Sequence, residues 1–485
     1  MDPAAAIQDT EIRGLSADSR KIAPGFLFAA LPGSREDGRG YIDQAVAQGA
    51  VAVLAPPGTS LKAYERPVQL VTDPNPRRRL ALMAARFYRR QPEVVAAVTG
   101  TNGKTSVASF THQIWRGLGH DAASLGTLGL WPPQRAAPGS LTTPDPVELH
   151  RCLKALAEDG IERLVLEASS HGLDQYRLDG IRVTAAAFTN LSRDHLDYHG
   201  SMAAYRAAKL RLFTDLLAPE GTAVLNTGVP LSEDIHAACK SRGIKVMTFG
   251  VAESDLRLLS QEPTAAGQRL MLDVFGHDHA VTLPLIGTFQ AANVLAALGL
   301  AIATGAEPEA ALAQLSGLGG VPGRVELVAR SPRGGQVFVD YAHTPDALDS
   351  VLEAVRPHTE GRLWVVFGCG GDRDRGKRPI MGEIARRLAD RVIVTDDNPR
   401  SEDPEAIRRE ILAAVPEAEE FDDRGEAIAS AVAALGPGDV LVIAGKGHES
   451  GQILGDRILA FNDRDVARAA VARLSQSAGT PGGAP

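Results

Sequence analysis

The residues with the clearest chemical potential lie in the segment 99–106, which reads Thr-Gly-Thr-Asn-Gly-Lys-Thr-Ser. Gly100 and Gly103 allow the backbone to curl so that its N–H groups point inward toward a bound anion. Lys104 can reach the terminal phosphates of a nucleotide, and the hydroxyl of Thr105 can coordinate Mg²⁺. Only two residues separate the glycines, which differs from the common phosphate loop, and an ordinary turn is the alternative interpretation. The segment predicts a site for a nucleoside triphosphate and Mg²⁺.

Two further side chains could hold the metal. Glu167 ends the predicted strand 163–167, and His195 lies in the polar segment 190–197 after another strand. We expect both at neighbouring strand ends, where they could hold Mg²⁺ together with Thr105. In the alternative interpretation Glu167 caps the next helix and His195 is a hydrogen-bonded loop histidine. Mg²⁺ prefers oxygen ligands, which favours Glu167 over His195.

Charged and glycine-rich loops follow four predicted strands in the C-terminal third, at 341–345, 368–375, 396–400 and 444–449. A zwitterion could bind there, with Arg400 on a carboxylate and Asp397 on an ammonium group. Arg373 offers a further anion contact, and Glu449 offers a negative partner. A plain helix start at 396–400 explains the residues equally well, so the residues alone leave both interpretations open.

The elements that must position these residues alternate between strand and helix. The loop at 99–106 joins a predicted strand, 94–99, to a predicted helix, 107–115, which is the context of a phosphate loop. The remaining predicted strands are 26–31, 50–54, 163–167, 184–189, 222–226, 337–340, 363–367, 391–395 and 440–443, with a helix at 41–47. This alternation predicts an α/β protein with largely parallel sheets.

We expect three domains. A small N-terminal α/β domain spans 1–90, a central domain of phosphate-loop type with helices on both faces of a mostly parallel sheet spans 91–322, and a Rossmann-like domain spans 323–475. The low-complexity tail, 476–485, is expected to be disordered.

Composition narrows the class of protein. The 485 residues suit two to four domains, and 44% hydrophobic and 23% charged residues are typical of a soluble globular protein. A net charge of −8 argues against a nucleic-acid partner. Three distant cysteines give neither a disulfide framework nor a metal-ligand spacing. No apolar run is long enough to cross a bilayer, and the first residues lack a signal peptide, so we expect a cytoplasmic enzyme.

Five ordered motifs resemble the ATP-dependent Mur ligases, most closely the type that adds the third residue of the peptidoglycan stem peptide. The motifs lie at 99–106, 167–173, 190–200, 340–346 and 445–449, and the resemblance runs from about Ser16 to Asp465. It implies that ATP, UDP-N-acetylmuramoyl-L-alanyl-D-glutamate and a diamino acid give a tripeptide, ADP and phosphate through an acyl phosphate. It also implies Mg²⁺, small-molecule substrates and domain closure over the ligands. We expect a monomer, without nucleic-acid partners or membrane insertion.

The resemblance also implies roles for individual residues. The ATP-binding positions are Gly100, Thr101, Asn102, Gly103, Lys104, Thr105, Ser106, Asn293, Arg324, Asp340 and His343. The positions for the UDP-linked substrate are Ser19, Thr142, Thr143, Ser169, Gln175, Arg177 and Lys209. The positions for diaminopimelate are Arg373, Asp397, Asn398, Pro399, Arg400, Gly445 and Glu449. The metal positions are Thr105, Glu167, His195 and Lys209, and the catalytic positions are Lys104, Lys209, Glu167 and His195.

Two of these positions need comment. Lys209 lies in a helical stretch, where a solvated surface lysine is the default; the resemblance instead implies a carbamate, which turns the cation into an anion able to hold a second Mg²⁺. Gln290 departs from the family pattern, which usually has asparagine there, so its contact is open.

The segment 397–400 matches the tetrad of meso-diaminopimelate-adding members, because lysine-adding members lack its arginine. Meso-diaminopimelate carries a second carboxylate that Arg400 can grip with two parallel hydrogen bonds. The alternatives are an L-lysine-adding ligase of the same family, a folylpolyglutamate synthase-like ligase, and a nucleotide-dependent switch that forms no peptide product.

Overall fold

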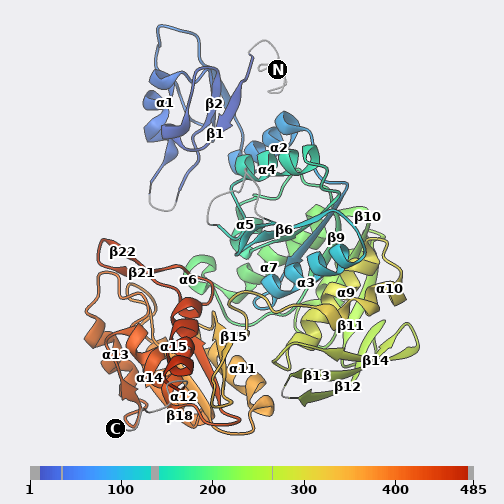
Figure 1. Cartoon of the computed structure of the whole chain (residues 1–485). Helices are drawn as coiled ribbons and strands as arrows, with labels where there is room; N and C mark the ends of the chain where they lie inside the picture. Colours follow the sequence, from blue (N-terminus) through green and yellow to red (C-terminus); the bar gives the residue numbers. More distant parts are fainter. Residues whose placement is uncertain (1–10, 34–35, 133–140, 265, 479–485) are drawn as a thin grey trace, which may run out of the picture. The chain divides into compact units, whose positions relative to one another are not determined.

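The computed structural model describes residues 11–33, 36–132, 141–264 and 266–478 (Figure 1). The chain divides into two compact units. Unit 1 comprises Met1–Ser254 and Ala296–Ala311, and unit 2 comprises Asp255–Leu295 and Leu312–Pro485. The chain passes between the units after Ser254, within α9 (Gln290–Ala303) and within α10 (Pro308–Ala313). The boundaries predicted for the three domains stay a prediction.

Unit 1 begins with a four-stranded parallel sheet of order β1-β2-β3-β4. Its elements are β1 (Gly14–Ser16), β2 (Phe26–Ala29), β3 (Ala52–Ala55), β4 (Gln69–Thr72), α1 (Ile42–Gln48) and α2 (Pro76–Tyr88), with short helices η2 (Ser19–Lys21) and η3 (Gly38–Tyr41). Successive strand side chains point to opposite faces. Leu27 therefore packs with Leu80 of α2, whereas Phe28 packs with Ile42 of α1.

Among the described residues, the part of the central sheet that lies in unit 1 has the strand order β11-β10-β9-β5-β8-β6-β7. Its strands are β5 (Val94–Thr99), β6 (Ala122–Gly126), β7 (Gly129–Trp131), β8 (Arg163–Glu167), β9 (Val183–Phe188), β10 (Leu217–Asn226) and β11 (Lys245–Gly250). All neighbours are parallel except β6 and β7. The helices are α3 (Lys104–Gly117), α4 (Pro146–Glu158), α5 (Ser170–Asp174), α6 (Leu196–His199), α7 (Met202–Arg211), the π-helical turn η4 (Leu212–Leu216) and α8 (Ser232–Ser241).

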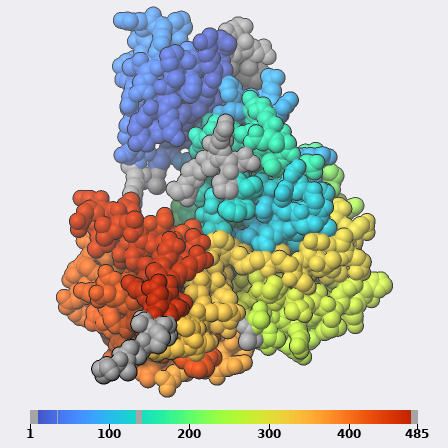
Figure 2. All heavy atoms as spheres, viewed as in Figure 1, coloured from blue at the N-terminus to red at the C-terminus, as the bar shows by residue number. Residues whose placement is uncertain are grey.

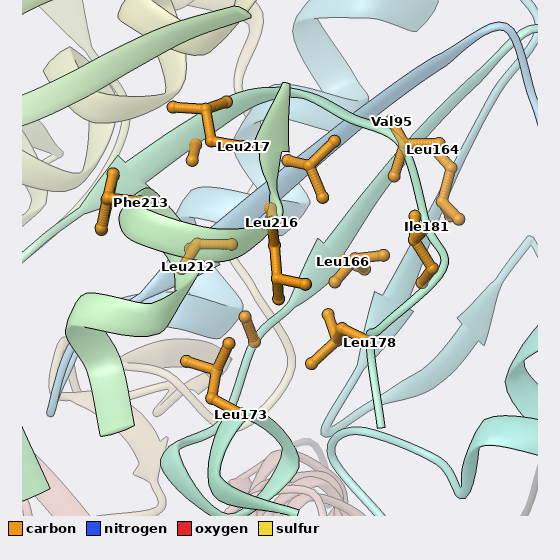
Figure 3. Close-up of a cluster of buried hydrophobic side chains, with 14 of the residues drawn as sticks. Val95, Leu164, Leu166, Leu173, Leu178, Ile181, Leu212, Phe213, Leu216 and Leu217 are labelled. Carbon is orange, nitrogen blue, oxygen red and sulfur yellow. The ribbon is translucent and has the colours of Figure 1, made fainter. Parts of the chain in front are cut away.

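A buried apolar cluster fixes the strands that carry the site. Figure 3 shows Leu164 and Leu166 of β8 in the same cluster as Leu178, Leu212 and Leu216. Burying one such leucine side chain contributes about 1.5–3 kcal/mol, so the cluster holds β8 firmly against its helices. The carboxyl end of β8, where Glu167 lies, is positioned by this packing.

Unit 2 contains an antiparallel meander, a six-stranded sheet and a hairpin. The meander consists of β12 (Leu256–Thr264), β13 (Gly267–Val274) and β14 (His277–Leu283). The six strands have the order β15-β16-β20-β17-β18-β19 and are β15 (Glu326–Arg330), β16 (Gln336–Asp340), β17 (Leu363–Phe367), β18 (Arg391–Val394), β19 (Glu419–Glu420) and β20 (Val440–Ala444). The hairpin is β21 (Gly451–Leu454) with β22 (Arg457–Ala460).

Helices complete unit 2: α11 (Pro345–Val355), α12 (Lys377–Leu388), α13 (Pro404–Leu412), α14 (Arg424–Ala434) and α15 (Asp463–Ala478), with η5 (Leu315–Gly317) and η6 (Arg356–His358). The four strands predicted for this region are consecutive in the sheet, which confirms that their polar loops share one edge. The first three residues of the predicted tail are helical, because α15 extends to Ala478; the rest, 479–485, lies outside the described residues. Among the described residues, no helix has the length and apolar character needed to cross a membrane.

Candidate active site

The loop after β5 has the conformation that its glycines predict. A Cβ atom at Gly100 would lie 1.9 Å from Thr189 Oγ1, and Gly100 has φ +152°, so only glycine fits. Gly103, with φ +86°, is the N-cap of α3, which begins at Lys104 and has no side-chain cap. The positive end of α3 therefore faces the loop, as an anion site requires.

Two loop amides differ from the expectation that the loop N–H groups point toward phosphate. Thr101 N donates to Asn190 O at 2.9 Å, and Asn102 N donates to Asn190 Oδ1 at 2.9 Å. These bonds tie the loop to the segment after β9 and give both amides an acceptor. Of the predicted phosphate contacts, the first turn of α3 and the side chain of Lys104 are unaffected by these bonds.

Two lysines converge on one carbonyl group of the loop. Lys104 Nζ donates to Gly100 O at 3.1 Å and to Thr101 O at 2.7 Å, and Lys209 Nζ donates to Gly100 O at 2.7 Å. Two ammonium groups at this separation repel each other. The arrangement therefore favours one positive charge, and not two, beside the phosphate loop.

The surface interpretation of Lys209 is wrong. Its residue is 1% exposed, and its Nζ lies 4.4 Å from the centre of the Tyr205 ring. Burial, and then the charge of Lys104, lower the pKa of Lys209 well below its ordinary value. Helical spacing alone could not reveal this, because α7 has a buried face that continues into η4.

Glu167 and Thr105 meet at the carboxyl ends of β8 and β5. Glu167 is 2% exposed, and Thr105 Oγ1 donates to its Oε2 at 3.2 Å. Thr127 donates to the same carboxylate from its N at 2.8 Å and from its Oγ1 at 3.1 Å. A Cβ atom at Gly126 would lie 2.1 Å from Glu167 Oε1, so that glycine makes room for the carboxylate.

These residues fit a hard cation. In the part of the chain that the structure describes, the Glu167 carboxylate has hydroxyl and amide donors but no ion-pair partner. A buried carboxylate of this kind is costly without a compensating charge. No group of three or more His, Cys, Asp or Glu side chains among the described residues could hold a metal ion, so Mg²⁺ at Glu167 and Thr105 would need further oxygen ligands, such as waters or phosphates.

The expectation that Glu167 and His195 follow neighbouring strands is wrong, because β5 lies between β8 and β9. The two residues thus flank the strand that carries the phosphate loop. The centre of the His195 ring lies 4.9 Å from the centre of the His171 ring, and His195 Nε2 lies 3.4 Å from Asp194 Oδ2. Burial lowers the pKa of His195. Its role as a metal ligand stays a prediction.

A hydroxyl-rich cluster adjoins Glu167. Thr143 Oγ1 donates to Glu167 O at 2.8 Å and shares a 2.9 Å hydrogen bond with Ser169 Oγ. Arg177 donates to Thr143 O at 2.6 Å and to Gln175 Oε1 at 2.7 Å. Thr142 joins through the hydroxyl of Thr127, at 3.1 Å. The structure therefore brings together five residues predicted to contact the muramoyl dipeptide: Thr142, Thr143, Ser169, Gln175 and Arg177. Ser19 is not part of this hydrogen-bonded cluster; it lies in η2, between β1 and β2, and donates to Gln44 Oε1 at 3.1 Å.

The remaining predicted ATP positions are in unit 2. Asn293 donates to Gln290 Oε1 at 3.0 Å. Gln290, which departs from the family pattern, therefore has a definite contact. Asp340 accepts from Val325 N and Ala342 N at 2.7 Å each. Burial raises the pKa of Asp340, although the positive charge of Arg324 acts to lower it. The Arg324 guanidinium lies 4.8 Å from the centre of the Tyr341 ring, and His343 Nδ1 lies 2.9 Å from Tyr341 O.

The loop after β18 carries Arg400, whose guanidinium group is only partly hydrogen-bonded. Arg400 donates from Nη1 to Gly371 O at 2.8 Å and to Asn398 O at 3.4 Å. Among the described residues its Nε and Nη2 make no hydrogen bond, which leaves a two-pronged edge of the guanidinium for a carboxylate. Asp397 Oδ2 is buried and has no hydrogen-bond partner within the described chain.

The other predicted diaminopimelate positions surround this loop. Glu449, expected to offer a negative partner, accepts from Asn398 Nδ2 at 3.0 Å and from Lys446 Nζ at 3.2 Å. A Cβ atom at Gly445 would lie 2.5 Å from Asp397 Oδ2. Arg373 is exposed and donates to Asp372 O at 3.2 Å. Pro399 lies between Asn398 and Arg400.

Sequence reasoning assigned no role to some residues that organise these sites. Lys446 is fully buried and also donates to Asn398 Oδ1 at 2.9 Å, and its position between two glycines after a strand was the available signal. Tyr205 shares a 3.1 Å hydrogen bond with Thr101 Oγ1 and lies against Lys209, and burial raises its pKa to about 12. Nothing in its sequence context indicated this.

The fold and the phosphate loop, with Lys104, Thr105 and Glu167 beside it, are those of an α/β enzyme that uses a nucleoside triphosphate. Family models match residues 11–88 (Mur ligase family, catalytic domain), 98–301 (Mur ligase middle domain) and 323–447 (Mur ligase, glutamate ligase domain). The chain belongs to the Mur ligase family, whose members are ATP-dependent, ADP-forming ligases.

Individual relatives cover nearly the whole chain. A Caulobacter vibrioides protein named UDP-N-acetylmuramoyl-L-alanyl-D-glutamate–2,6-diaminopimelate ligase is 54% identical over 462 residues, 94% of each chain. One of the same name from Bradyrhizobium diazoefficiens is 52% identical over 474 residues, 96% of each chain. A solved structure of that name is 35% identical with a TM-score of 0.71, and covers 97% of this chain and 96% of its own.

Proposed function

We propose that the protein is a cytoplasmic, monomeric ligase that uses ATP to add meso-2,6-diaminopimelate to UDP-N-acetylmuramoyl-L-alanyl-D-glutamate in peptidoglycan precursor synthesis. Family membership and relatives at 50–54% identity with this activity in their names support the reaction. The observation that carries the amino-acid choice is that one loop holds both Arg400, with part of its guanidinium unbonded, and Asp397, with an unbonded carboxylate oxygen.

In the first step an oxygen of the D-glutamyl side-chain carboxylate attacks the γ-phosphorus of ATP, and ADP leaves. The N-terminal turn of α3 and Lys104 hold and neutralise the phosphates. The cluster of Thr143, Ser169 and Arg177 adjoins Glu167 and is suited to hold the muramoyl dipeptide. When bound, Mg²⁺ neutralises phosphate charge, and we assign Thr105 and Glu167 to it, with His195 and a carbamate on Lys209.

Carbamylation of Lys209 needs a neutral amine, whose nitrogen forms a bond to carbon dioxide and loses a proton. Burial at 1% exposure and the nearby Lys104 charge both favour the neutral form. The product is an anion beside the positive charge of Lys104. The low pKa of Lys209 therefore supports the modification that the family resemblance implies.

In the second step the amine of diaminopimelate attacks the acyl phosphate carbon, an amide bond forms, and phosphate leaves with one oxygen from the original carboxylate. The Nε and Nη2 edge of Arg400 suits the distal carboxylate, and the unpartnered Asp397 Oδ2 suits an ammonium group. L-lysine lacks the distal carboxylate, so that edge of Arg400 would stay without a partner. This difference favours diaminopimelate over L-lysine.

The product decides between the candidates. The protein is incubated with ATP, the UDP-linked dipeptide and either diaminopimelate or L-lysine, and each substrate is omitted in turn. We expect phosphate and a tripeptide of the diaminopimelate mass, by mass spectrometry, only when all three substrates are present. Preferred use of L-lysine would identify the alternative ligase, turnover of a folate without the UDP-linked dipeptide would identify a folylpolyglutamate synthase, and phosphate release without an amide product would identify a switch.

A further inference from the structure

The loop that carries Arg400 has a strained backbone. Arg400 has φ +54°, a left-handed conformation that costs a non-glycine residue about 1–2 kcal/mol. Such a conformation persists only where the surroundings determine it. The segment that does so here is not contiguous with the loop but lies about fifty residues later in the chain, in the β21–β22 hairpin.

The hairpin holds Arg400 from both sides of its backbone. Arg400 N donates to Ile453 O at 3.1 Å, and Gly455 N donates to Arg400 O at 2.7 Å. Ile453 N donates to Asn398 Oδ1 at 3.0 Å, on an amide that is 4% exposed. Three backbone groups of β21 and its turn therefore fix the two ends of the segment 398–400.

The direction of the guanidinium depends on this clamp. With the backbone left-handed, Arg400 Nη1 reaches Gly371 O, and a Cβ atom at the neighbouring Gly370 would lie 2.7 Å from Nη1. A carboxylate is held by two parallel bonds only when the fork is correctly oriented. A change of backbone conformation at Arg400 would turn its Nε and Nη2 edge away.

We infer that the β21–β22 hairpin is a positioning element for amino-acid selection, with Ile453 as its main positioning residue. This inference rests on the proposed function, because it assigns the hairpin a role only in recognising the distal carboxylate of diaminopimelate. The hairpin's hydrogen bonds to Arg400 and Asn398 are made to the 398–400 segment of its own unit. Loss of the hairpin should therefore weaken diaminopimelate use selectively.

The geometry provides a matched pair of variants. Ile453 lies directly opposite Ile458 in the antiparallel hairpin. The N–H and C=O of Ile453 point to the 398–400 segment and not to β22, so Ile453 and Ile458 form a non-hydrogen-bonded pair. In such a pair the N–H and C=O of Ile458 also point away from the partner strand. Ile453→Pro and Ile458→Pro consequently break no bond between β21 and β22, but only Ile453→Pro removes the donor to Asn398. Ile458 is 74% exposed, and Figure 2 shows the red C-terminal stretch of unit 2 at the surface.

Steady-state kinetics with both amino acids test the inference. Relative to Ile458→Pro, we expect Ile453→Pro to raise KM for diaminopimelate about tenfold, the effect of losing one hydrogen bond in a positioned network, with kcat at saturation nearly unchanged. The kcat/KM for L-lysine should stay the same in both variants, so the diaminopimelate-to-lysine ratio falls. An unchanged ratio in a folded Ile453→Pro protein would overturn the inference, whereas a wild-type protein that does not use diaminopimelate would overturn the proposed function instead.

Hydrogen exchange of the wild-type protein keeps the inference testable if Ile453→Pro does not fold. The protein is saturated with the UDP-linked dipeptide and an ATP analogue that cannot transfer its γ-phosphoryl group. We expect diaminopimelate to slow amide exchange at Arg400 and Ser401 and in 453–456, because a fixed Arg400 side chain opposes opening of the clamp. L-lysine should leave exchange there unchanged. Equal protection by both amino acids, or by neither, would overturn the inference.

Discussion

Replacing Gly126 with alanine should disable the site without removing any candidate functional group. The new Cβ atom would lie 2.1 Å from Oε1, 2.5 Å from Cδ and 2.6 Å from Cγ of Glu167. Since nonbonded carbon and oxygen atoms need more than about 3 Å, the buried carboxylate must move by about 1 Å. That movement breaks the 3.2 Å bond from Thr105. A hydrogen bond to a charged group contributes about 1.5–3 kcal/mol, which corresponds to a loss of roughly 10–150-fold in kcat.

The assay is ADP formation with all three substrates, measured over a range of Mg²⁺ concentrations. Gly126→Ala should lower kcat and require more Mg²⁺, and overpacking should lower the free energy of unfolding by about 1–3 kcal/mol. Gly40→Ala is the matched control, because a Cβ atom there meets nothing within 4 Å. Full turnover of Gly126→Ala with an unchanged Mg²⁺ dependence would refute the assignment of Glu167 to the metal.

Four further predictions follow from individual side chains. Arg400→Ala should lower kcat/KM for diaminopimelate roughly 100-fold, because it removes a two-pronged bond to carboxylate, and should leave L-lysine kinetics unchanged. Arg424→Ala leaves its fully buried carboxylate partner unpaired and should lower the free energy of unfolding in urea by about 3–5 kcal/mol, whereas loss of the exposed ion pair in Arg409→Ala should change it by less than about 1 kcal/mol. Burial lowers the pKa of His150, so between its folded pKa and about 6.5 the unfolded chain binds more protons; stability should fall from pH 7 to pH 5, and by less in His150→Gln. Carbon-13-labelled bicarbonate should give a carbamate NMR signal that is absent in Lys209→Met; a signal of equal size in both proteins would contradict the modification.

Local patterns were sufficient to predict the strands whose ends carry the sites. The strand at 94–99 and the helix after it were predictable because an apolar β-branched run and helical spacing flank a glycine turn. Four strands of unit 2 were predictable for the same reason, since buried parallel strands form continuous apolar runs. The meander of β12, β13 and β14 was missed because its strands are partly exposed and carry polar residues on one face.

Tertiary contacts decided what local patterns could not. Lys209 is buried because α7 packs its lysine against the loop after β5, and helical periodicity gives no indication of that partner. The order β9-β5-β8 cannot be read from any single strand. The prediction that Glu167 and His195 follow neighbouring strands was therefore wrong. The left-handed conformation of Arg400 depends on a hairpin that follows about fifty residues later. Short motifs thus predicted the chemistry, whereas burial and backbone geometry required the fold.

The central claim is that the D-glutamyl carboxylate is phosphorylated by ATP before the amine attacks. The most direct measurement uses UDP-linked dipeptide with heavy oxygen in both positions of that carboxylate and determines the isotopic mass of the released phosphate. The account predicts that each phosphate carries one labelled oxygen and that the other remains in the new amide. Unlabelled phosphate accompanying full tripeptide formation would contradict it.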